Sequence, residues 1–154
     1  MKIMGIDPGG KTTGVVIIKH NKLLCYCKLT GETFTFRQKM KTYTMKIEEM
    51  IQKYKPSFVF CEEPFLRGKA NKLMNRLLGA IEVSCSKQVS FVHPMTVKAH
   101  FSTVGKDKKE LAKEVRKRLA LTSRRDCDIL ISKEEWDITD ALAVAFYGLD
   151  NYRK

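Results

Sequence analysis

Hydrophobic and polar residues follow two patterns along this chain. The first, which is typical of strands, predicts three strands near the amino terminus. Residues 1–6 are largely apolar and end at Asp7-Pro8-Gly9-Gly10, which has the composition of a tight turn. Residues 12–19 are rich in β-branched side chains, and residues 23–29 form a third apolar run after a short polar break. The pattern predicts a three-stranded meander with a hairpin turn at 20–22.

The second pattern is typical of helices, because apolar residues recur every three or four positions. It predicts a helix of about 15 residues from Met40 to Tyr54 and another, with a wide apolar face, over 69–86. A capping box at 107–110 opens a further helix, whose basic residues should face outward: Lys108, Lys109, Lys113, Arg116 and Lys117. We expect the last helix to run from about Lys133 to Leu149.

Two short apolar segments between these helices read as buried strands. The first covers 57–61 and ends at Glu62-Glu63-Pro64, and the second covers 89–92 and is stopped by His93-Pro94. The order is therefore three strands, helix, strand, helix, strand and two helices. With 154 residues, enough for one hydrophobic core, we expect a single α/β domain over 1–154 with a five-stranded mixed sheet flanked by helices.

The charge is strongly basic and unevenly distributed. The chain has 29 Lys and Arg against 17 Asp and Glu, a net charge of +12. Residues 66–125 hold 15 basic and four acidic residues, whereas residues 126–154 hold three basic and seven acidic ones. Contacts to phosphates release condensed counterions, so a small basic domain favours a polyanionic partner. The charge predicts nucleic-acid binding but gives no activity by itself.

The composition also bears on the compartment. No apolar run approaches the roughly 20 residues of a membrane-spanning helix, and Asp7 falls where a signal peptide would still be apolar. None of the cysteines has zinc-site spacing; they are Cys25, Cys27, Cys61, Cys85 and Cys127. We expect buried, reduced thiols in the cytoplasm (the host cytoplasm if the chain is phage-encoded), with a disulfide or zinc site as the less favoured alternative.

Four carboxylates are the candidate chemistry. Asp7 ends the first predicted strand and Glu62 the fourth, and neighbouring strand ends deliver side chains to one sheet edge. Asp137 and Asp140 are three residues apart and share a helix face. Such acids must protonate or bind cations, and Mg²⁺ prefers oxygen ligands. The set predicts metal-dependent phosphodiester hydrolysis, although each acid alone also fits a turn, a strand end or a helix cap.

One motif points elsewhere and must be weighed. Residues 5–12 match the phosphate-binding pattern G-x-x-x-x-G-K-[ST]. That loop needs a helix beginning at its Lys-Thr pair, whereas residues 13–18 read as a strand. We therefore do not expect a P-loop ATPase.

Three segments together resemble RuvC-type Holliday-junction resolvases, especially the compact bacteriophage versions. They are Gly5-Ile6-Asp7-Pro8-Gly9 with Thr13-Gly14, Cys61-Glu62-Glu63-Pro64-Phe65, and Asp137-Ile138-Thr139-Asp140-Ala141-Leu142-Ala143. Their order and spacing agree along nearly the whole chain. The resemblance implies an RNase H-like fold, a homodimer, Mg²⁺ or Mn²⁺ as cofactor, and paired nicks at four-way DNA junctions.

The resemblance also implies roles for individual residues. The four carboxylates named above would be the catalytic metal ligands, with Lys98 and Lys109 beside the cleaved phosphate. Phe65 would stack on an unpaired base at the junction centre, and the helix over 69–86 would form the dimer contact. The remaining expected DNA contacts are Arg67, Lys69, Lys72, Lys106 and Lys108. Ordinary packing of Phe65 and a solvated face for the lysines are the simpler alternatives.

Other functions stay open from the sequence. A RuvC-related nuclease acting on structured RNA would carry the same acids, and a non-catalytic branched-DNA-binding protein would carry the same charge. A sugar-kinase-like fold also places a phosphate loop after an Asp, but one lobe of 154 residues lacks the second lobe that closes over ATP. Pro64 and the basic segment 67–69 depart from the family pattern, which leaves the cleavage-sequence preference and the strictness for four-way junctions open.

Overall fold

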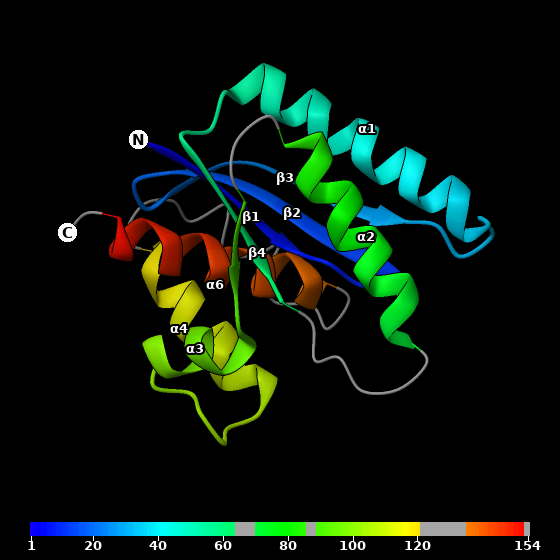
Figure 1. Ribbon diagram of the computed structural model, residues 1–154. Helices are drawn as coiled ribbons and strands as arrows, with labels where there is room; N and C mark the ends of the chain where they lie inside the picture. The colour runs from blue at the N-terminus through cyan, green and yellow to red at the C-terminus, as the bar shows by residue number, and fades with distance from the viewer. Residues whose placement is uncertain (64–69, 86–88, 121–134, 153–154) are drawn as a thin grey trace.

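The computed structural model describes residues 1–63, 70–85, 89–120 and 135–152. A five-stranded sheet with the order β3-β2-β1-β4-β5 separates two layers of helices (Figure 1). Helices α1 and α2 pack on one face through one apolar cluster, and α6, backed by α4, packs on the other through a second. This is the mixed α/β sheet expected from the sequence.

The strands agree closely with the predicted ones. They are β1 (Lys2–Asp7), β2 (Thr12–Lys19), β3 (Lys22–Thr30), β4 (Phe58–Glu62) and β5 (Val89–Val92). β1, β2 and β3 form the antiparallel meander, while β4 pairs parallel to β1 and β5 parallel to β4. Because β2 begins at Thr12, no helix starts at the Lys-Thr pair. The match of residues 5–12 to the phosphate-binding pattern therefore does not indicate a P-loop.

The helices differ from expectation in two places. They are α1 (Phe36–Tyr54), α2 (Ala70–Ser84), α3 (Pro94–His100), α4 (Lys108–Ala120) and α6 (Trp136–Asn151). α1 starts four residues before Met40 because Thr35 and Gln38 form a reciprocal capping box. α3 was not predicted: Pro94 occupies its first turn, and the His93 Nδ1 accepts a hydrogen bond from the Met95 N–H. Of the last predicted helix, residues 133–134 lie outside the described chain.

The described cysteines are free thiols, as expected, but only two of the four are buried. Cys61 and Cys85 are buried, Cys25 and Cys27 are half-buried, and all four are free thiols; Cys127 lies outside the described residues. Within the described ranges no helix is long and apolar enough to cross a membrane.

The first turns of α6 lie unusually close to the meander. A Cβ built on Gly5 would stand 2.2 Å from the Ala141 carbonyl oxygen, and one on Gly14 would stand 2.1 Å from the Asp137 carbonyl oxygen. Any larger residue at these two positions would push α6 away from the sheet. The glycines therefore set how closely Asp137 approaches the end of β1.

Candidate active site

The four candidate carboxylates gather at one edge of the sheet. Ile6 pairs with Cys61 in the parallel β1–β4 ladder, so the next residues, Asp7 and Glu62, lie side by side at the ends of the two strands. Asp137 and Asp140 lie in the first two turns of α6, which packs against β1 and β2. The predicted convergence of these strand ends with the last helix is present in the structure.

The acids influence one another's ionisation. Burial raises the pKa of Asp7 well above its usual value, and the charges of Asp140, Glu62 and Asp137 raise it further. Burial, followed by the charge of Asp140, raises the pKa of Glu62 to about 7. The pKa of Asp140 is raised as well, because burial outweighs the nearby lysine charges. The cluster therefore resists full ionisation until a cation compensates it.

Two hydrogen bonds orient the acids on α6. The Thr12 hydroxyl donates to the Asp137 Oδ2 at 2.6 Å, and the Lys108 ammonium donates to the Asp140 Oδ2 at 2.9 Å. Burial alone would lower the pKa of Lys108, but the hydrogen bond and charge of Asp140 outweigh it, so the pKa is raised. The same ammonium lies 5.6 Å from the centre of the Trp136 ring. Lys108 is therefore a cation at the cluster.

A small cavity connects the acids with two lysines. Glu62, Asp140, Lys98 and Lys108 line a space of about 90 Å³, which has room for a few water-sized groups. The positive charge of Lys98 lowers the pKa of both Glu62 and Asp140, although it does not set the net direction of either. Both signs of charge thus face the same space.

The donor chemistry fits a hard divalent cation. Carboxylate oxygens are the ligands that Mg²⁺ prefers, and a cation would compensate the repulsion between the buried Asp7 and the three acids whose charges raise its pKa. Among the residues that the structure describes, no three His, Cys, Asp or Glu side chains stand close enough to enclose an ion. The acids that would hold the metal are Asp7, Glu62, Asp137 and Asp140, and their side chains have to close inward around it.

The predicted lysines differ in how they lie relative to the acids. Lys108 is exposed, as expected, and its ammonium also contacts Asp140, which the sequence did not predict. Lys109, expected beside the cleaved phosphate, is exposed and lies about 100° around the helix axis from Lys108. Lys98 lies in the small cavity, as expected for a residue near the acids. Nothing in the sequence indicated that the Thr12 hydroxyl donates a hydrogen bond to Asp137.

The other candidate DNA-contacting residues are exposed or lie outside the described residues. Lys72 is exposed on α2 and Lys106 is exposed just before α4. Phe65, Arg67 and Lys69 fall in residues 64–69, which the structure does not describe.

The strand order, the antiparallel meander and the acids at the carboxyl ends of β1 and β4 define an RNase H-like fold of the nuclease type. The family model for crossover junction endodeoxyribonuclease RuvC matches residues 3–147. The chain belongs to the RuvC family, whose nucleases depend on metal ions.

Individual relatives agree with this assignment. The crossover junction endodeoxyribonuclease RuvC of Alkaliphilus oremlandii is 30% identical over 156 residues, covering 94% of this chain and 90% of the relative. That of Wigglesworthia glossinidia brevipalpis is 29% identical over 149 residues, covering 93% and 89%. Thermus thermophilus RuvC, solved in complex with a Holliday junction substrate, has the same fold with a TM-score of 0.82 at 22% identity, covering 99% of this chain and 96% of the other.

The raised pKa of Glu62 predicts how stability depends on pH without metal. The folded carboxyl has a pKa of about 7, above the unfolded value of about 4.3, so the folded state holds this proton more tightly. The free energy of unfolding should fall by up to about 3 kcal/mol as pH rises from roughly 4.5 to 7. Denaturant unfolding in EDTA across this range measures it.

A matched pair of variants isolates the contribution of Glu62. Glu62→Gln should flatten the decline, whereas Glu63→Gln, at the exposed neighbouring residue, should leave it unchanged. Added Mg²⁺ should restore more stability at pH 8 than at pH 5, because it binds the ionised acids. Equal pH profiles for Glu62→Gln and the parent protein would contradict the raised pKa.

Proposed function

We propose that this chain is a metal-dependent, structure-selective endonuclease that resolves Holliday junctions, and acts on other branched DNA, by paired nicks. The observation that carries the proposal is the buried Asp7 surrounded by three further acids at one sheet edge, in a chain with a net charge of +12. The acidic pocket suits a metal cation, and the basic protein around it suits the DNA phosphate on which that cation would act. Membership of the RuvC family supports the same reaction and substrate.

The chain's own residues prepare the reaction. Asp7, Glu62, Asp137 and Asp140 would hold Mg²⁺, for which Mn²⁺ can substitute, and the bound ions supply positive charge that acidifies water and stabilises the leaving oxygen. The Thr12 hydroxyl keeps Asp137 turned toward the end of β1. The other side chains bind and orient the DNA, so no covalent intermediate with the protein is required.

The lysines of the site would neutralise the phosphate. Lys98 and Lys108 share a cavity with two of the acids, which supports a role for their ammonium groups in neutralising a phosphate bound beside those acids. Further backbone contacts in the proposal come from Lys72, Lys106 and Lys109 and from Arg67 and Lys69, while Phe65 would stack on an unpaired base. Backbone contacts carry no base information, so the shape of the junction should dominate recognition.

The proposal includes a homodimer acting in the cytoplasm. Two opposed nicks need two sites, and α2 exposes apolar surface that a second copy would cover: Val83 is 86% exposed. A groove beside it is lined by Leu78 and Gly79 of α2 and by Phe91 of the edge strand β5. The four described cysteines are free thiols, which suits a reducing compartment.

Replacing Asp7 tests the proposed activity. Asp7→Asn should keep junction binding but reduce nicking of a labelled four-way junction in Mg²⁺ by roughly 100-fold or more, because a cation ligand is lost. Glu63→Gln serves as the matched control and should nick at the parental rate. Cleavage of structured RNA in preference to the junction, or junction binding without any nicking by the parent protein, would contradict the proposed function.

A second pair of variants separates the roles of adjacent lysines. Lys108→Ala should lower kcat by about 10-fold or more, because Asp140 loses the cation to which it is hydrogen-bonded, and Lys108→Arg should restore part of it. Lys109→Ala should leave kcat unchanged and, if this lysine contacts a phosphate, reduce the slope of log binding constant against log salt by about one. Steady-state kinetics at saturating junction concentrations measure kcat. A larger loss of kcat in Lys109→Ala than in Lys108→Ala would reverse the roles assigned to the two lysines.

The dimer interface can be tested by charge. Val83→Glu places an unpaired carboxylate in the proposed apolar contact, where its burial is costly, so the protein should become monomeric in sedimentation experiments. Val104→Glu changes an exposed valine in the loop before α4 and should leave the dimer intact. A monomeric parent protein, or a dimeric Val83→Glu variant, would exclude this interface.

A further inference from the structure

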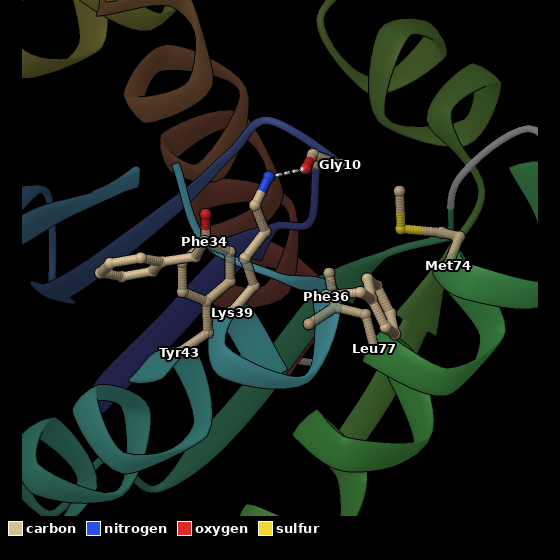
Figure 2. Close-up of a pocket in the computed structure, with 8 residues that line it drawn as sticks. Gly10, Phe34, Phe36, Lys39, Tyr43, Met74 and Leu77 are labelled. Atoms are coloured by element: carbon tan, nitrogen blue, oxygen red, sulfur yellow. Dashed lines mark hydrogen bonds between the residues drawn. The ribbon is translucent and has the colours of Figure 1, made fainter. Parts of the chain in front are cut away.

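A second cavity lies beside the turn that follows Asp7, and its lining is largely apolar. It has a volume of about 400 Å³ and is bounded by the turn after β1, the start of α1 and one face of α2 (Figure 2). Phe34, Phe36 and Met74 supply most of its apolar wall, and Phe34 is 41% exposed. An open pocket with aromatic and thioether walls is ready to receive a flat, apolar-faced group.

Two hydrogen bonds keep the pocket's upper wall in place. The Lys39 ammonium donates to the Gly10 carbonyl oxygen at 3.1 Å, as Figure 2 shows, and the buried Tyr43 hydroxyl donates to the Lys11 carbonyl oxygen at 3.2 Å. Both donors come from α1. The turn that follows Asp7 is therefore held by α1, and the pocket lies between them.

We propose that this pocket receives one unstacked nucleobase of the DNA, next to the phosphate that is cut. The inference rests on the proposed function for its substrate class. Aromatic rings offer stacking faces for any base, and the Lys39 side chain places a positive charge in the lining of the pocket for a flanking phosphate. The combination of an aromatic wall with this positive charge suits a nucleotide better than an apolar peptide or a second protein copy.

The distance from the acids fits this occupant. Gly10 is three residues after Asp7, so their Cα atoms are at most about 11 Å apart. Successive nucleotides of a duplex strand advance about 3.4 Å along the axis, which puts the pocket within about three nucleotides of a phosphate held at Asp7. A Cβ on Gly10 would meet no atom within 4 Å, so the pocket's edge is open to the approaching strand.

Photocrosslinking tests the proposal directly. A four-way junction carrying 5-iodouracil at successive positions around the branch point is bound to the protein in EDTA, irradiated, and analysed by mass spectrometry. One position close to the branch point should crosslink to Phe34, Phe36 or Met74. In the Phe34→Ala variant that crosslink should weaken, and junction affinity should fall roughly 5- to 150-fold, the loss expected for one base–aromatic stack. Phe34→Tyr, which keeps a ring, should restore affinity.

The control and the opposing outcomes are clear. Tyr26→Ala removes an aromatic ring of similar exposure, 40%, from the edge strand β3, and should change neither readout. Unchanged affinity and unchanged crosslinking in Phe34→Ala would overturn the proposal, as would crosslinks confined to residues outside the pocket. Because both readouts are made without divalent metal, a parent protein that binds but never nicks would reject the proposed function while leaving the pocket's test intact.

Discussion

The close contact between α6 and the meander is the constraint on which the site depends. Gly5 and Gly14 present bare backbone to the first turns of α6, at distances that no side chain could occupy. The alanines of α6 complete this fit, since Ala141, Ala143 and Ala145 are fully buried. Because the helix lies this low on the sheet, the acids on its first two turns reach the end of β1. A bulkier interface would have separated the carboxylates and removed their mutual influence.

That closeness has an energetic cost which the chain retains. Three of the four acids have raised pKa values, chiefly because they are buried and secondarily because they face one another. A sequence selected for stability alone would replace at least one of them, so the cluster is a typical compromise between stability and function. Lys108 offsets part of the repulsion through Asp140, and the cation expected from the family offsets the remainder. The basic surface then serves the DNA rather than the fold.

The sequence predicted the sheet and the acids well because both follow from short patterns. Strand ends at Asp7 and Glu62 can be read from where apolar runs stop, and parallel neighbours share an edge. α3 was missed because Pro94 was taken only as the end of a strand, although proline also starts helices. The contact of Lys108 with Asp140 was not predicted, because one residue corresponds to about 100° of helix rotation and only the packing of α4 against α6 fixes that rotation. Phe65, Arg67 and Lys69 remain predictions from the family resemblance.

The turn from Asp7 to Lys11 connects the acids to the apolar pocket, so a ligand bound in the pocket can influence the acids. One end of the turn carries a cation ligand, while its carbonyl oxygens at Gly10 and Lys11 are bound by α1. A base bound against Phe34 would therefore contact the same turn that positions Asp7. Stacking energy released in the pocket could then help hold the phosphate among the acids, so that only DNA with an unstacked base near the branch gains the full binding energy. Duplex DNA keeps its bases stacked and would lack this contribution, which gives preference for distorted DNA a basis besides overall shape.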